Sequence, residues 1–218
     1  GYYNFFDKKN DINVNLLHTR LGIIDLDKRS NQPFTDGDLT IIFNGEIYNY
    51  LEIKKKLLLK KKVKFKTNSD TEVLLKAYKV FGINFFNELE GMWSFAIWDN
   101  KKKSLLLSRD RFSEKPLYVF QDHDGIYFGS EIKYLKSLSQ KKFKIDEGHL
   151  VRYLFQGYKS LYKYNSTFYE NIENFSNASF AIINKSLKLK YKKYWKLNFK
   201  PKKMSFNYAV NQTKKIIL

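Results

Sequence analysis

Three polar residues, Asn44, Gly45 and Glu46, follow the apolar run 39–42 after a single phenylalanine. An asparagine-glycine pair normally marks a hairpin turn, and a second strand of plain alternation should then follow. The other interpretation is that a strand delivers these residues to a ligand at its end. A glycine there would let the backbone come close to that ligand. The local sequence leaves both interpretations open.

Two more charged residues extend the chemistry that this stretch could do. Arg20 can bind a carboxylate through a two-pronged hydrogen bond. Glu46 and Asp70 can bind an ammonium group, so the three charged side chains together could orient the head of a free amino acid, that is, its α-carboxylate and α-ammonium groups. Each residue also has a plainer role. Arg20 could form a surface salt bridge, Glu46 could be solvated, and Asp70 could help to cap a helix that begins near Thr71.

The hydrophobic pattern predicts the elements that must position these residues. Residues 16–26 are typical of one strand, in which Arg20 points away from the face that holds Leu17 and Leu21. The other elements predicted in the first part of the chain are a strand at 40–48, a helix from Asn49 to about Lys62, and a short strand around Phe65.

The helix that carries Asp70 has start and stop signals. Ser69 precedes Glu72 at the capping-box spacing, and the pattern predicts a helix from there to Gly82. Residues 92–98 are apolar on both faces, so we predict a central strand covered on both sides. The later elements are a strand at 104–108, a hairpin of 117–120 with 126–128, helices at 130–138 and 146–155, a hairpin at 178–190 that turns at Asn184-Lys185, and a helical pattern at 206–218.

Strands that alternate with helices at irregular intervals indicate an α+β layered fold, with stacked sheets and helices on the outside. No segment repeats at a fixed period. The 218 residues suffice for one domain with an appended piece. Pro201, with lysines around it, marks a linker before the final helical pattern.

The composition excludes several classes of protein. A hydrophobic content of 43% is ample for burial, so wholesale disorder is not expected. No apolar run is long enough to cross a bilayer, and residues 1–20 contain no signal peptide. The net charge of +18 would suit nucleic acid, but it lies in scattered lysine runs that favour a solvated surface. We therefore expect a soluble cytoplasmic protein with no nucleic-acid or membrane partner.

The chain contains no cysteine, which excludes disulfides, thiolate metal sites and thiol chemistry within these residues. We expect no metal site. No serine or cysteine motif accompanies the histidines, so we expect them to be structural or exposed. They are His18, His123 and His149.

Six blocks of sequence occur in the order seen in one protein family. The blocks are His18–Asp25 with Gln32-Pro33, Phe43–Tyr50, Ser69–Glu72, Gly91–Asp99, Arg109–Phe112 with Lys115–Tyr118, and Ser130–Leu135. Together they closely resemble the glutaminase domain of the glutamine-hydrolysing asparagine synthetases, over about residues 16–194. Glutaminases that feed sugar-phosphate or phosphoribosyl acceptors share the His-Thr-Arg and Asn-Gly pieces. The Gln-Pro, Lys-Pro-Leu-Tyr and Ser-Glu-Ile-Lys pieces favour the asparagine synthetase branch.

The resemblance implies a layered fold of the N-terminal-nucleophile hydrolase type, with two stacked, mainly antiparallel sheets flanked by helices. It implies catalytic roles for Asn44, through its side-chain amide, and for Gly45, through its backbone N–H. Both would stabilise the negative oxygen that forms when glutamine is hydrolysed. Arg20, Glu46 and Asp70, together with that pair, match the glutamine-binding positions of the family. One such donor lowers the activation barrier by on the order of 3 kcal/mol, so Asn44→Ala should remove nearly all the glutaminase activity of an intact enzyme.

In this family the attacking group is the thiol of an N-terminal cysteine, whose free amine serves as the base. We therefore expect the chain to be truncated at its front, and to bind glutamine without hydrolysing it. We expect a glutaminase domain over residues 1–200, and a linker with the first helix of a truncated synthetase domain over residues 201–218. No cofactor is expected in the chain itself. The missing synthetase domain implies ATP and Mg²⁺, with aspartate as a further substrate, and a homodimer is left open.

Two alternatives stand beside this interpretation. The amide acceptor could be a sugar or a peptide in envelope biosynthesis, because the acceptor pocket would lie outside these residues. The chain could also be a non-catalytic module that binds glutamine. The sequence departs from the family pattern at Ser113 and Glu114, where the family has a glycine and an apolar residue, and this leaves the geometry of that loop open.

Overall fold

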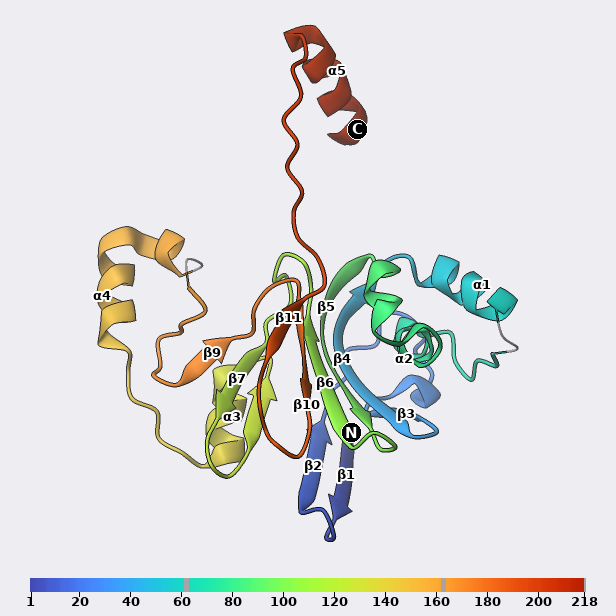
Figure 1. Ribbon diagram of the computed structural model, residues 1–218, viewed down its shortest axis with the longest axis vertical. Coiled ribbons are helices and arrows are strands. Elements are labelled where there is room, and N and C mark those ends of the chain that lie inside the picture. The colour runs from blue at the N-terminus through green and yellow to red at the C-terminus, as the bar shows by residue number, and fades with distance from the viewer. Residues whose placement is uncertain (61–62, 162–163, 218) are drawn as a thin grey trace.

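The main sheet of the protein has six antiparallel strands. The computed structural model describes residues 1–60, 63–161 and 164–217. The strands lie in the order β11 (Tyr191–Lys193), β10 (Ser179–Ile183), β6 (Ser104–Arg109), β5 (Gly91–Asp99), β4 (Leu39–Ile47) and β3 (Phe34–Asp36). Helices α1 (Tyr50–Lys60) and α2 (Asp70–Phe81) cover one face of this sheet (Figure 1).

A second layer covers the other face. It consists of a three-stranded sheet in the order β8 (Ile126–Gly129), β7 (Tyr118–Gln121) and β9 (Ile172–Asn174), and of a hairpin formed by β1 (Tyr2–Asp7) and β2 (Ile12–Leu17). Helix α3 (Ile132–Ser139) packs against β8 and β7. The remaining elements are α4 (Glu147–Gln156), α5 (Phe206–Ile217) and the 3-10 helices η1 (Lys28–Ser30), η2 (Gly82–Asn87) and η3 (Gly157–Ser160). The predicted α+β fold of stacked, mainly antiparallel sheets flanked by helices is confirmed.

Strand β5 has apolar side chains on both faces of the main sheet, so both faces must be buried. Trp93, Phe95 and Ile97 pack into the core under the helices. Ala96 and Trp98 alternate with them and pack into the core under the second layer. All five side chains are buried, because both faces of the strand are covered. The predicted central strand is confirmed.

Helix α2 begins and ends where its signals predict. Ser69 is the N-cap, and its hydroxyl accepts the Glu72 N–H at 3.2 Å. The N–H of Gly82, just after the last turn, donates to the carbonyl of Tyr78. Twelve residues therefore form one helix whose first residue is Asp70.

Two predicted strands are corrected by the structure. Strand β2 ends at Leu17, and residues 18–26 form an irregular loop in which Arg20 donates to carbonyl groups of its own loop. No strand pairs with this loop in the described part of the chain. The predicted short strand around Phe65 is also absent, because the Glu72 carboxylate takes the N–H groups of the next two residues.

Other predicted elements differ from the structure only at their ends. Helix α1 ends at Lys60, and residues 61–62 of the prediction lie outside the described residues. The hairpin predicted for 178–190 pairs β10 with β11, but its second strand begins only at Tyr191. The β1–β2 hairpin carries no signal that we recognised in the sequence.

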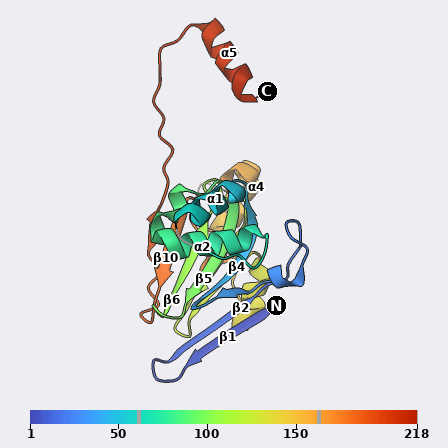
Figure 2. The ribbon, with the colours of Figure 1, turned by 90° about the vertical axis from the view of Figure 1, so that its right-hand side faces the viewer.

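The C-terminal segment extends away from the layers. Helix α5 has no buried residue and stands at the end of an irregular stretch, apart from both sheets (Figures 1 and 2). The boundary predicted at residue 201 remains a prediction. None of the helices in the described ranges is long and apolar enough to cross a membrane.

Candidate functional site

The backbone N–H and C=O groups of successive residues in strand β4 point alternately to its two sides. Beyond the end of the strand, the Tyr48 N–H donates to the Glu90 carbonyl at 2.8 Å. Before its start, the Asn100 N–H donates to the Asp38 carbonyl at 2.8 Å. Even-numbered residues therefore bond to β5, and odd-numbered residues direct their N–H and C=O groups to the opposite edge. Gly45 is one of the residues that face this edge.

Strand β3 covers the edge of β4 only as far as Ile41, which lies opposite Phe34. Beyond that point, side chains from other segments take the place of a strand. The contacts are Gln32 Oε1 with the Phe43 N–H at 2.6 Å, His18 Nε2 with the Phe43 carbonyl at 3.1 Å, and Asp70 Oδ2 with the Ile47 N–H at 3.1 Å. The Gly45 N–H lies between these anchors and has no partner among the described residues.

Position 45 accepts only glycine. Its φ is +156°, and a Cβ atom would lie 2.1 Å from the Met92 carbonyl oxygen. Asn44 lies opposite Ser94 in the continuous ladder with β5, so Asn44 and Gly45 are inside a strand. The hairpin-turn interpretation is therefore wrong.

Asn44 and Glu46 share one face of β4, the face covered by the second layer, because side chains two apart in a strand point the same way. The Nδ2 group of Asn44 donates to the Ser130 hydroxyl at 3.2 Å. Ser130 directly follows β8, so the contact joins the two layers. Both Asn44 and Glu46 are half-buried.

Asp70 is the acidic group with the least exposure at this edge, at 7%. Its second oxygen accepts the Thr71 N–H at 2.9 Å, while Ser69 caps the helix. Burial raises the pKa of the Asp70 carboxyl above its ordinary 3.8, and the nearby Glu46 charge raises the pKa further. An ammonium group placed here would be attracted by two carboxylates that repel each other.

The loop that carries Arg20 is tied to the segment just before α2. The Nη2 group of Arg20 donates to the Ile24 carbonyl at 2.8 Å and also to the Asp25 carbonyl. The Asp25 carboxylate accepts the Asn68 N–H at 2.6 Å, and this contact ties the loop to the segment just before α2. Arg20 is therefore tethered beside the start of α2, although no contact between its guanidinium and the other four predicted residues is observed in the described part of the chain.

The structure thus brings Asn44, Gly45, Glu46 and Asp70 to one end of β4, with the loop of Arg20 tethered to the same end. Three residues that contact this group or its neighbours Phe43 and Thr71 were given no role in the site from the sequence: Gln32, His18 and Ser130. All three lie in blocks that carried the family resemblance, and this was the available signal. Nothing local in the sequence indicates which backbone or side-chain group each one contacts.

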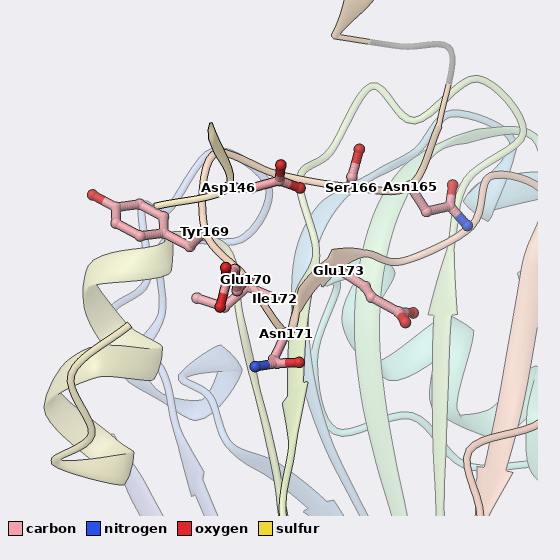
Figure 3. Close-up of a pocket in the computed structure, with 8 residues that line it drawn as sticks. All are labelled: Asp146, Asn165, Ser166, Tyr169, Glu170, Asn171, Ile172 and Glu173. Carbon is pink, nitrogen blue, oxygen red and sulfur yellow. The ribbon is translucent and has the colours of Figure 1, made fainter. Parts of the chain in front are cut away.

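The hollow shown in Figure 3 lies elsewhere. It has a volume of about 380 Å³ and is lined by Asp146 and by residues of the segment from Asn165 to Glu173, all of them polar except Ile172. None of the predicted site residues lines it. A separate surface group, Asp122, His123 and Asp124, could gather ligand atoms around a cation, but Lys141 already forms ion pairs with both aspartates at 3.4 and 3.0 Å.

Comparison with known families gives one match over most of the chain. Residues 4–195 match a family described as a glutamine amidotransferase domain. The chain is 34% identical to the putative glutamine-hydrolysing asparagine synthetase 2 of Methanocaldococcus jannaschii, over 91% of this chain and 40% of that protein. It is 37% identical to the glutamine-hydrolysing asparagine synthetase 2 of Bacillus subtilis, over 86% of this chain and 25% of that protein. The chain thus spans less than half the length of these relatives.

A solved structure supports the fold. The glutamine phosphoribosylpyrophosphate amidotransferase from B. subtilis superposes with a TM-score of 0.58 at 20% identity. The match covers 82% of this chain and 34% of that one. At this identity the likeness extends to the fold alone, and it agrees with the layered arrangement expected from the sequence.

Proposed function

Because this chain belongs to the glutamine amidotransferase domain family, we propose that the exposed edge of β4 binds L-glutamine. Arg20 takes the α-carboxylate, and Glu46 with Asp70 takes the α-ammonium group. The side-chain amide of Asn44 and the backbone N–H of Gly45 point to the carbonyl oxygen of the glutamine side chain. These are the roles expected from the family resemblance.

One observation carries the proposal. Three successive N–H groups, those of Phe43, Gly45 and Ile47, face the same edge, and the outer two are bonded to Gln32 and Asp70. The middle N–H is left for a ligand. Since the backbone at Gly45 is held on both sides, this donor is in place before a ligand arrives, which is the condition for stabilising a developing negative oxygen.

The electrostatics suit a zwitterionic ligand. Burial, and to a lesser degree the charge of Glu46, raise the pKa of Asp70, so the ligand-free site holds two acids whose negative charges disfavour each other. An ammonium group relieves that repulsion. We infer that a free amino acid, with an ammonium beside its carboxylate, fits this site better than a peptide-bound glutamine does.

For the whole protein we propose hydrolysis of glutamine, with transfer of the ammonia to a second domain that uses ATP and Mg²⁺ to amidate aspartate. The attacking thiol, the acceptor site and the ATP site would all lie outside these 218 residues, which contain no cysteine. The residues described here bind and orient the amide, and they provide donors for the oxygen that becomes negative.

The test is calorimetric titration of the 218-residue chain with L-glutamine, D-glutamine and L-norvaline, which keeps the amino-acid head but lacks the amide. We expect L-glutamine to bind tightest. Glu46→Gln should weaken the binding of all L-ligands, whereas Glu52→Gln, a matched change on the exposed face of α1, should not. If L-glutamine does not bind, or binds no better than its D-enantiomer, the proposal fails.

A further inference from the structure

The pairing between β3 and β4 ends before Phe43 and leaves that residue without a strand partner on this side. Phe34 pairs with Ile41, and the next pair in the same register would set residue 32 opposite Phe43. The ladder stops before that point, because β3 begins at Phe34. The backbone of Phe43 would then have to find partners elsewhere.

Two side chains, those of Gln32 and His18, bond to the Phe43 backbone in place of a strand. Gln32 is 6% exposed, and its carboxamide oxygen accepts the Phe43 N–H at 2.6 Å while the carboxamide nitrogen donates to the Thr71 hydroxyl at 3.3 Å. Since a backbone N–H can only donate, the orientation of the carboxamide is set. Gln32 therefore links the edge of β4 to the first turn of α2, where Asp70 lies.

His18 bonds to the backbone carbonyl of Phe43, the residue whose N–H is bonded to Gln32. Burial lowers the pKa of the His18 ring below 6.5, so the ring is neutral at pH 7. A carbonyl can only accept, so Nε2 carries the proton that it donates to the Phe43 oxygen at 3.1 Å. His18 is two residues from Arg20, and this places the loop that carries the guanidinium against the strand.

We propose that Gln32 and His18 are positioning residues: they replace a β-strand beside Phe43 and so fix the direction of the Asn44 amide and the Gly45 N–H. A strand segment that lacks a neighbour on one side can rotate about its axis. Gln32 and His18 hold the backbone of Phe43, and Asp70 holds the N–H of Ile47. Because Gly45 lies between these two points, its backbone cannot rotate freely. This inference rests on the proposed glutamine site.

The inference predicts a specific change in ligand preference. The head of the ligand contacts Arg20, Glu46 and Asp70, so L-norvaline and L-glutamine share that part of the binding energy. Only glutamine uses the donors of β4. Loss of an anchor should therefore reduce the preference for glutamine over norvaline by about threefold to tenfold, the range for one hydrogen bond. A merely structural loss would weaken both ligands alike.

The variants come in matched pairs. Gln32→Met and His18→Leu remove the anchor at similar side-chain size. Gln32→Glu keeps an acceptor for the Phe43 N–H, and His18→Gln keeps a donor near the position of Nε2. We expect the first pair to lose the preference and the second pair to retain most of it. Gln121→Met, whose side chain is exposed on β7, is the control and should match the wild type.

Amide hydrogen exchange gives a readout that needs no ligand. In Gln32→Met the Phe43 amide should exchange at least tenfold faster, while the Ile41 amide, which is paired to β3, should stay protected. If the wild type binds no glutamine, the proposed function fails but the exchange result still tests the anchor. The inference is overturned if Gln32→Met keeps the protection of Phe43, or keeps the wild-type preference for glutamine. Should the Met and Leu variants not fold, equal loss of preference in Gln32→Glu and His18→Gln would overturn it.

Discussion

The Nδ2 atom of Asn44 lies 3.2 Å from the Ser130 hydroxyl oxygen, and this contact joins the main sheet to the end of β8 in the second layer. The two hydrogens of a carboxamide nitrogen point in different directions, so one can be held by Ser130 while the other is offered to a ligand. The contact limits rotation of the Asn44 side chain.

Removal of this hydroxyl should weaken glutamine binding. For Ser130→Ala we expect the dissociation constant for L-glutamine to rise about fivefold, the equivalent of one ordinary hydrogen bond. Ser130→Thr keeps the hydroxyl and should bind as the wild type does. Titration calorimetry measures both, with Ser166→Ala as the control, because Ser166 bonds to His149 in a different part of the fold. Unchanged affinity in Ser130→Ala would exclude this role.

Glutamine binding should release protons in mildly acidic solution. The pKa of Asp70 is raised in the free protein, so between pH 3.8 and that raised value the free carboxyl is partly protonated. A bound ammonium favours the carboxylate and expels the proton. Affinity should therefore increase as the pH rises through this window and become constant above it.

Calorimetry in buffers of different ionisation enthalpy measures this release. Asp70→Asn should abolish it, and a wild-type affinity that is flat across the window would contradict the assignment. The same raised pKa means that the stability of the ligand-free chain decreases as the pH rises through the window, because the native state binds more protons there than the unfolded state does.

The buried carboxylate of Glu72 should be a major contributor to stability. It accepts the N–H groups of Lys66 and Thr67 at 2.9 and 2.7 Å and pairs with the Lys76 ammonium at 3.4 Å. Glu72→Gln would set an NH₂ group against donors and remove one of the two carboxylates that pair with the buried Lys76 ammonium, the other being Asp36 at 3.1 Å, at a cost of about 2 kcal/mol. Urea unfolding measures the loss. Glu52→Gln, on the exposed face of α1, should change the free energy of unfolding by less than about 0.5 kcal/mol.

A glycine at position 113 should stabilise the protein. Ser113 lies at φ +61°, in the left-handed region that costs an L-residue roughly 1–2 kcal/mol. Glycine avoids that cost but loses more backbone entropy on folding, roughly 0.5–1 kcal/mol. Ser113→Gly should therefore raise the free energy of unfolding by about 0.5–1 kcal/mol.

The matched control for that change is Ser137→Gly in the exposed middle of α3, which should lower stability by up to about 1 kcal/mol. Thermal unfolding of both variants measures the contrast. A decrease in both would show that the backbone at Ser113 is not strained.

Local patterns predicted elements whose signals lie within a few residues. Helix α2 was predicted with its ends because Ser69 and Gly82 mark its boundaries in the sequence itself. Strand β5 was recognised as central because its apolar residues occupy both faces. Both properties depend on the alternation or capping of neighbouring residues, and distant segments change them little.

The sequence by itself determined which residue types were available for chemistry and the fold class that carries them. Only the tertiary structure decided that Gly45 keeps a free N–H and that residues 18–26 are a loop. The reason is that, beyond the end of β3, the hydrogen-bond partners on the open side of β4 come from distant segments, here Gln32, His18 and Asp70. Where β3 stops, and which side chains then replace it, is set by packing across the layers and leaves no periodic signal in the chain.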